Sequence, residues 1–314
     1  MTSSPDTEPA SASAPSPPTD PGVASSYLDR LAARSAATGT VLCLGLDPDP
    51  EALPDGFSND LRGVESFARL VLDAAAPFAA AVKPNLAFFE AFGSAGIAAL
   101  ERLRAAIPAG LPVVMDAKRG DIGSTAARQA VALYDGLGAD AITVSPYLGE
   151  EAIAPLLARA DRFAYVLCRT SNPGAGELQA LKVAADPELG APSEPLWARV
   201  ARRARAWGPG ATVGLVVGAT APAELAAIRR LAPGLAFLVP GVGAQGGDET
   251  AVLADGRATS APAGSRVGGG LLVNVSRGIA GAARPRAGSA RPRDLGEDIA
   301  AAARDWAARL PVLP

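Results

Sequence analysis

Residues 112–121 read PVVMDAKRGD, a short run of apolar and β-branched side chains that turns abruptly charged at Asp116. A run of this length and composition is typical of a buried β-strand. Lys118 and Asp121 follow Asp116 closely, so three ionisable groups stand just beyond the end of the predicted strand. Charged side chains at such a position are candidates for function, because the ends of parallel strands converge on one site.

The same pattern recurs along the chain from about Tyr27, and longer Ala/Leu/Arg-rich stretches of helical character separate the apolar runs. This alternation is typical of repeated βα units around a parallel sheet. A doubly wound open sheet would show it too, but no GxGxxG follows the first run and the count stops at eight. We therefore predict an α/β fold with a single TIM-type (β/α)8 barrel over residues 25–314. The predicted strands are Val41–Leu46, Ala79–Lys83, Pro112–Asp116, Ala141–Val144, Ala164–Cys168, Thr212–Val217, Ala236–Val239 and Leu271–Asn274.

Two segments between these runs exceed ordinary loop length, residues 170–194 and 245–270. Long connections are often binding loops or lids, and in a barrel we expect both to open on the catalytic face. The predicted helices are Val64–Ala75, Ala95–Ala106, Ser124–Leu137, Glu151–Arg159, Pro195–Ala206, Ala221–Leu231 and Leu295–Leu310.

Residues 1–24 are rich in Pro and Ser without a hydrophobic period, which predicts a disordered tail. No basic residue precedes Arg30, and no apolar run approaches the roughly 20 residues that cross a bilayer, so neither a signal peptide nor a membrane span is expected.

Cys43 and Cys168 lie in apolar runs, where a reduced, buried thiol is the usual state. These features favour a cytoplasmic protein. The net charge of −3, without a basic run, argues against nucleic acid as a partner.

The basic residues restrict the possible chemistry. The chain has no histidine, which excludes His-dependent nucleophilic triads, HExxH zinc sites and imidazole acid–base catalysis. Lysine occurs only at Lys83, Lys118 and Lys182, and arginine supplies every other basic side chain. Lys182 lies in a polar stretch, whereas the other two follow apolar runs. A lysine there suggests a need for a compact charge whose pKa can be tuned, which guanidinium does not provide.

Charges of both signs end the first three predicted strands: Asp47, then Lys83, then Asp116 with Lys118 and Asp121. We expect them to share one cavity, where alternating Lys and Asp would offset like-charge repulsion. Such an array holds ammonium groups protonated and aimed, as a reaction that forms and then protonates a carbanion requires.

A single aspartate after a strand is more often a helix N-cap, the interpretation we favour for Asp49.

The opposite side of the predicted mouth resembles a phosphate site. PGVGAQGGD (residues 240–248) follows strand seven and NVSRG (residues 274–278) follows strand eight, with Arg277 available for a bidentate contact. Residues 169–174, RTSNPG, either bind the imide edge of a heterocycle or form an ordinary turn, and residue type alone leaves both open.

With these segments assembled, the chain resembles the orotidine 5′-phosphate decarboxylase family, in particular its longer bacterial branch, from about Tyr27 to Leu310. The most specific element is Asp116-Ala-Lys118-Arg-Gly-Asp121, which matches the family's D-x-K-x-x-D signature. Lys83 and the PGVGAQGGD loop occur in the matching order. Ser145-Pro146-Tyr147 and the two long segments depart from compact members.

The resemblance implies decarboxylation of orotidine 5′-monophosphate to UMP in pyrimidine biosynthesis, directly at C6 and with neither metal nor cofactor. It also implies a homodimer with composite active sites. By position, the resemblance implies that Asp47 binds the ribose, that Lys83 links the ribose to the other charges, and that Asp116 lies against the substrate carboxylate. It implies that Lys118 protonates C6 and that Asp121 and Thr125 reach into the neighbouring subunit's site. It also implies that Ser171 binds the pyrimidine and that Gln245 and Arg277 bind the phosphate.

Two alternatives remain. A Mg-dependent sugar-phosphate decarboxylase or aldolase-like barrel resembles this chain in the D-x-K-x-x-D run, but such relatives carry a carboxylate where Lys83 stands, and an ammonium would repel the metal. A non-catalytic nucleotide-binding barrel is the other alternative. Loss of turnover would be expected to erode the costly charge cluster, and all its members are present.

Overall fold

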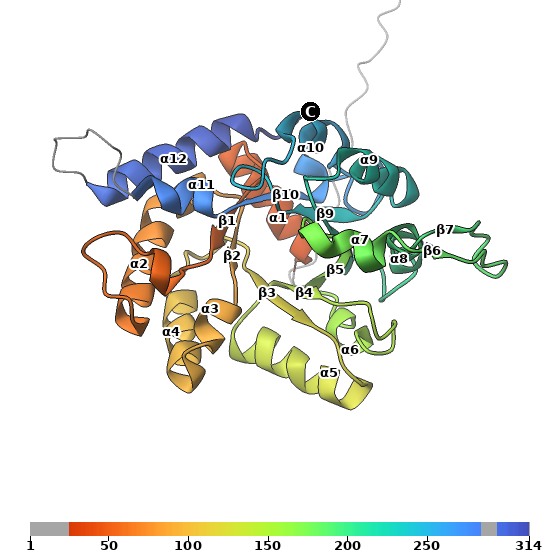
Figure 1. The fold of residues 1–314 in the computed structure, drawn as a ribbon, viewed down its shortest axis with the longest axis horizontal. Helices are drawn as coiled ribbons and strands as arrows, with labels where there is room; N and C mark the ends of the chain where they lie inside the picture. The colour runs from red at the N-terminus through yellow and green to blue at the C-terminus, as the bar shows by residue number, and fades with distance from the viewer. Residues whose placement is uncertain (1–24, 284–293, 314) are drawn as a thin grey trace, which may run out of the picture.

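A computed structural model describes residues 25–283 and 294–313. Its centre is a ring of eight parallel strands in the order β2-β1-β10-β9-β8-β5-β4-β3 (Figure 1). Isolated parallel bridges between Val82 and Val113 and between Asn85 and Asp116 join β2 to β3, so the sheet meets itself as a barrel. The strands are β1 (Leu42–Leu46), β2 (Ala81–Pro84), β3 (Val114–Arg119), β4 (Ala141–Val144), β5 (Phe163–Arg169), β8 (Val213–Val217), β9 (Ala236–Val239) and β10 (Leu271–Val275).

Each of the eight predicted strands is confirmed, because each apolar run is buried between barrel core and helices. The bounds of β3 differ most. It continues past Asp116 to Arg119, and its pairing with β4 shifts register between Met115 and Arg119. Lys118, inside this irregularity, has a positive φ of 47°, which is uncommon for a residue other than glycine. The switch from apolar to charged residues therefore marks a bulge and not the end of the strand.

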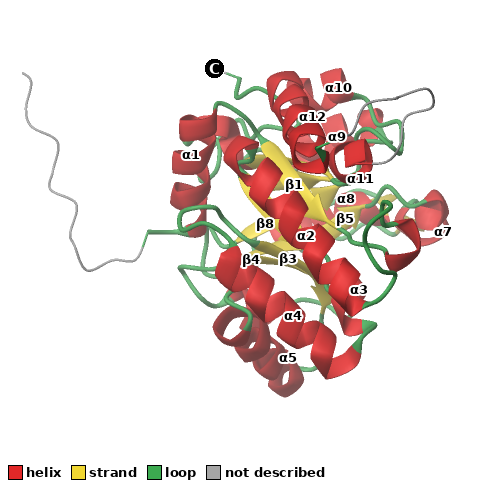
Figure 2. Ribbon diagram, turned by 90° about the vertical axis from the view of Figure 1, so that its left-hand side faces the viewer, coloured by secondary structure: helices red, strands yellow, loops and turns green. Residues whose placement is uncertain are grey.

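Helices enclose the ring of strands (Figure 2). The predicted helix 124–137 is α5 followed by a π-helical turn at Val131–Gly136, and the predicted helix 151–159 is helical only at Ala154–Leu157. The other predicted helices are confirmed to within a few residues. The longer helices are α1 (Tyr27–Thr38), α2 (Leu61–Ala75), α4 (Gly93–Ala106), α5 (Gly123–Ala130), α8 (Leu196–Ala204), α9 (Pro222–Leu231), α10 (Glu249–Asp255) and α12 (Leu295–Arg309).

Helix α1, which the sequence analysis did not predict, covers the amino-terminal ends of the strands. The Tyr27 ring stacks on Phe163, the first residue of β5, with 4.8 Å between centroids, and its hydroxyl lies 3.0 Å from that of Tyr165. These aromatic side chains are buried, so α1 closes the barrel at the end opposite the charged residues. The predicted tail, residues 1–24, lies outside the described residues.

The two long segments follow different courses around the barrel. Residues 170–194 follow the carboxyl end of β5 and contain α7 (Gly176–Gln179) and the antiparallel pair β6 (Lys182–Val183) and β7 (Glu194–Pro195). The expectation that residues 245–270 also open on the catalytic face is wrong beyond their first few residues. Helix α10 carries the chain back, and the Thr259 and Ser260 amides donate to the Pro233 carbonyl ahead of β9. Within the described ranges, no helix is both long and apolar enough to span a bilayer.

Candidate active site

The charges at the ends of β2 and β3 form a buried ion pair. Lys83, only 4% exposed, donates from Nζ to Oδ2 of Asp116 over 2.9 Å. Burial alone would lower the pKa of Lys83, but the Asp116 and Asp47 carboxylates outweigh it and raise that pKa above its usual range. The Lys83 ammonium therefore stays charged at neutral pH.

Lys118 approaches the same carboxylate from the other side, its Nζ donating to Oδ1 of Asp116 over 2.6 Å. Burial would raise the pKa of Asp116, but Lys83 and Lys118 outweigh it and hold that pKa well below the usual carboxyl range. The Lys118 side chain is 52% exposed, whereas that of Asp116 is 13% exposed. The predicted Lys/Asp/Lys alternation is thus present, with Lys118 at its open end.

Asp121 does not join this cluster within one chain. Its Oδ1 accepts from the amide of Ile122, and among the described residues it forms no ion pair with Lys83 or Lys118. Of the five charges that we expected to share one cavity, Asp47, Lys83 and Asp116 line it and Lys118 and Asp121 do not, so that expectation is wrong for a single chain. Beyond the irregular part of β3, the Asp121 amide donates to the Ala152 carbonyl. Thr125, on α5, lines neither cavity of the mouth.

Asp47 and Asn274 present unused acceptors. Within the described part of the chain, the buried Oδ1 atoms of both side chains have no hydrogen-bond partner. Both residues line the cavity that contains Lys83 and Asp116. Buried acceptors are normally satisfied, so a pair of orphaned ones facing a cavity indicates a site for ligand hydroxyl or N–H groups. Asp49, in contrast, accepts from the Glu51 amide as the N-cap of a short 3₁₀ helix, as we predicted.

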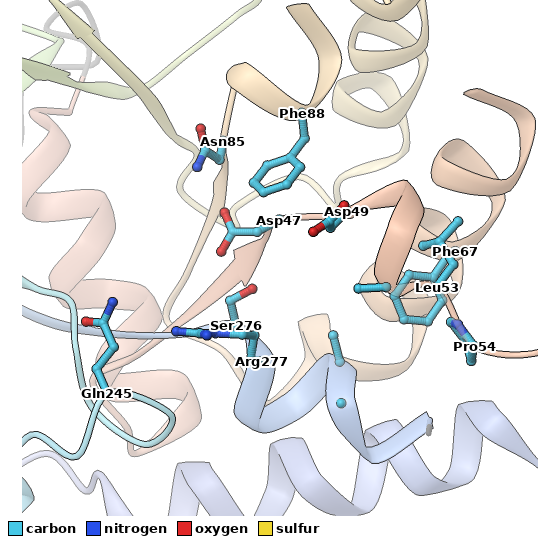
Figure 3. A pocket seen from close by; sticks show the side chains of 13 residues that line it. Asp47, Asp49, Leu53, Pro54, Phe67, Asn85, Phe88, Gln245, Ser276 and Arg277 are labelled. Atoms are coloured by element: carbon cyan, nitrogen blue, oxygen red, sulfur yellow. The ribbon is translucent and has the colours of Figure 1, made fainter. Parts of the chain in front are cut away.

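The mouth of the barrel contains two adjoining cavities, of about 180 and 480 Å³. The smaller reaches down to Lys83 and Asp116, and the larger opens toward Leu53, Phe67 and Phe88. Figure 3 shows residues of the larger cavity, with Asp47 and Ser276 near its centre and Gln245 on a separate loop. Residues shared by both cavities are Asp47, Asn85, Gln245, Ser276 and Arg277.

The predicted phosphate and heterocycle residues meet at Gly241. Its φ is 99°, and a Cβ built there would lie 3.0 Å from Oε1 of Gln245 and 3.1 Å from Cβ of Ser171. Glycine is therefore required both by conformation and by the close approach of these side chains. Arg277 borders both cavities at the start of α11 (Arg277–Ala280), and in the described residues it forms no ion pair. Its guanidinium can therefore receive an anion at the mouth.

Sequence reasoning assigned no individual role to three residues of this region: Asn85, Thr143 and Asn274. Asn85 directly follows β2, Asn274 is the last residue but one of β10, and both line the cavity, so their position could have identified them. Thr143 lies inside β4, and its hydroxyl donates to Oδ1 of Asp116 over 2.9 Å. A threonine within an apolar strand gave no such signal.

Comparison with known proteins identifies the family of this chain. The sequence profile described as "Orotidine 5′-phosphate decarboxylase / HUMPS family" matches residues 40–291. Orotidine 5′-phosphate decarboxylase from Thermomicrobium roseum is 49% identical over 256 residues, which cover 81% of this chain and 86% of the relative.

Two solved structures from Leishmania donovani have the same fold. OMP decarboxylase aligns with a TM-score of 0.73 and 38% identity, over 90% of this chain and 97% of that one. UMP synthase aligns with a TM-score of 0.74 and 40% identity, over 90% of this chain but only 55% of that longer one. The chain belongs to the orotidine 5′-phosphate decarboxylase / HUMPS family.

Proposed function

We propose that this protein decarboxylates orotidine 5′-monophosphate to UMP and carbon dioxide in pyrimidine biosynthesis, the activity for which its relatives are named. The observation that carries the assignment is Asp116 held between two ammonium groups, at 2.9 Å from Lys83 and 2.6 Å from Lys118. A fixed carboxylate beside a positioned proton donor suits a reaction in which a substrate carboxylate leaves and a proton replaces it.

In the proposed reaction, the bond between C6 and the carboxylate breaks and its electron pair remains on C6 as a vinyl carbanion. Asp116 faces the departing carboxylate, so their repulsion is relieved as neutral carbon dioxide forms. The Lys118 ammonium stabilises the developing charge, then transfers its proton to C6 and regains one from water. Lys83 stays protonated and, despite the burial of Asp116, helps to lower the pKa of that carboxyl group, so Asp116 stays ionised throughout.

The rest of the nucleotide fits the cavity walls. The unpaired Oδ1 of Asp47 accepts from a ribose hydroxyl, and Arg277 with Gln245 and the glycine loop holds the phosphate. Ser171, packed against Gly241, binds the pyrimidine. These roles assign every predicted contact residue except Asp121 and Thr125.

Asp121 and Thr125 act, in this proposal, in the neighbouring site of a homodimer. An apolar surface adjoins them: Ile122, Tyr147 and Leu148 are 63%, 78% and 58% exposed. The two loops that carry these residues run side by side, because the Ser145 amide donates to the Arg119 carbonyl. A second copy on this surface would bury these side chains and cover the open side of Lys118, bringing the partner's Asp121 into the charge cluster.

A hybrid dimer tests the shared site. One subunit carries Lys118→Ala and the other Asp121→Ala, and differently tagged copies allow the hybrid to be purified. If Asp121 crosses the interface, one site has both lesions and the other is intact, so turnover should be about half that of the wild-type dimer. Each parent homodimer should be nearly inactive. A hybrid as inactive as its parents would place Asp121 in its own chain's site.

The assignment itself is tested by loss of orotidine 5′-monophosphate absorbance with purified protein in EDTA. Turnover without added metal is expected, because Lys83 at 2.9 Å from Asp116 puts an ammonium where a Mg²⁺ site would need a further carboxylate. A requirement for added Mg²⁺ would favour the sugar-phosphate alternative, and tight UMP binding without turnover would favour the non-catalytic one.

We also propose a cytoplasmic location and a single catalytic domain over residues 25–314. Both cysteines are free and buried, and burial raises the pKa of the Cys43 thiol to about 12 despite nearby Lys83. Inert, unpaired thiols are usual for proteins of a reducing compartment.

A further inference from the structure

The hydroxyl of Thr143 is fully used at the base of the charge cluster. Thr143 lies on β4 and is 2% exposed. Its Oγ1 donates to Oδ1 of Asp116 over 2.9 Å and accepts from the amides of Ala117 and Lys118, each over 3.0 Å. A hydroxyl offers one donor and two acceptor sites. All three sites of Thr143 are occupied by residues of β3, the strand that carries Lys118, the proposed proton donor.

These two amides belong to the bulge of β3. Strand pairing between β3 and β4 is interrupted between Met115 and Arg119, so the amides of Ala117 and Lys118 do not enter the regular ladder. A buried amide left unpaired costs free energy, and Lys118 also carries the strain of a φ of 47°. The Thr143 hydroxyl replaces the missing ladder acceptor and thereby stabilises the bulge.

The same hydroxyl fixes the carboxylate. Oδ1 of Asp116 accepts both from Thr143 and from Nζ of Lys118, while Oδ2 accepts from Lys83. Thr143 thus holds one oxygen of Asp116 and the backbone of Lys118 at once.

We propose that Thr143 is a positioning residue for decarboxylation, aligning Asp116 and Lys118 without touching substrate. It is 2% exposed, and its hydroxyl contacts the Asp116 carboxylate and the backbone amides of Ala117 and Lys118, so it acts through these groups. The inference rests on the proposed roles of Asp116 and Lys118. It predicts that loss of the hydroxyl impairs the chemical step and leaves binding largely intact.

Thr143→Val, which keeps the shape and removes the hydroxyl, should lower kcat about 10- to 100-fold, because the amides of Ala117 and Lys118 lose their acceptor and Oδ1 of Asp116 loses one of its two donors. KM should stay within about threefold of wild type, and Thr143→Ser should recover most of kcat. The matched control is Thr212→Val. Thr212 is 1% exposed and its hydroxyl has no partner among the described residues, so kcat should not change.

Amide hydrogen exchange gives a readout that does not depend on turnover. Exchange at Ala117 and Lys118 should accelerate in Thr143→Val and stay unchanged in Thr212→Val. If the valine variant fails to fold, Thr143→Cys retains a weak donor and should give an intermediate loss of kcat.

A wild-type protein without decarboxylase activity would refute the proposed function, while the exchange result would still test the structural link. Wild-type kcat in Thr143→Val, equal losses in the Ser and Val variants, or a loss confined to KM would overturn the positioning role.

Discussion

Replacing Lys118 by alanine should lower kcat for orotidine 5′-monophosphate by at least about 10⁴-fold, the largest effect expected for a single substitution in this protein. The change removes both the proton donor and the charge that stabilises the carbanion. No other ammonium is placed to substitute within the described residues, because Lys83 donates to the far oxygen of Asp116 and is buried beneath it. Single-turnover decay of substrate absorbance measures the effect.

Lys182→Ala is the matched control for Lys118→Ala. Lys182 is the third and last lysine of the chain, lies exposed on β6 and lines neither cavity of the mouth. It should leave kcat and KM unchanged, which separates a specific loss from a general effect of removing an ammonium. Residual turnover of Lys118→Ala above about one per cent of wild type would assign protonation of C6 to another group.

Asp116→Asn should lower kcat by about 10²- to 10³-fold without raising KM, the second largest expected effect. The carboxamide keeps the size of the side chain but loses its charge. Repulsion toward the substrate carboxylate then disappears, so the substrate binds at least as well while the acceleration gained from its relief is lost. The two lysines at 2.9 and 2.6 Å also lose the charge that holds them in place.

Binding of UMP distinguishes these contributions, because the product lacks the carboxylate. UMP affinity should change less than KM for the substrate, and Asp73→Asn, which alters an exposed carboxylate paired with Arg69, should change neither. A rise in KM with unchanged kcat would contradict the proposed placement of Asp116 and indicate a role in ground-state binding only.

The local sequence was sufficient to predict the barrel. Each strand is a short apolar run buried on both faces. Such a run can be recognised from the composition of the strand itself, without knowledge of its neighbours. The same rule placed Asp47, Lys83 and Asp116 together, because residues at the carboxyl ends of adjacent parallel strands must converge. The isolated parallel β-bridge between Asn85, after β2, and Asp116, on β3, shows this convergence directly.

Features that depend on contacts between distant segments could not be predicted in this way. Helix α1 closes the barrel through Tyr27, whose ring meets Phe163 far along the chain. The part of residues 245–270 that follows α10 was expected at the catalytic face but lies at the opposite end, because its glycine-rich composition does not encode which end of the barrel it reaches. Asp121 fits the D-x-K-x-x-D spacing, yet its carboxylate accepts from the Ile122 amide and, among the described residues, forms no ion pair with Lys83 or Lys118.

The sequence by itself thus determined the number of strands, the absence of imidazole chemistry and the identity of the charges at the mouth, since these follow from residue type and local period. Only the tertiary structure decided how those charges are held. The bulge of β3 gives Lys118 its positive φ, and a hydroxyl from β4 supplies the hydrogen bonds that the strand ladder omits there. Such a bond joins residues that are adjacent only after the barrel has formed, so no local pattern records it.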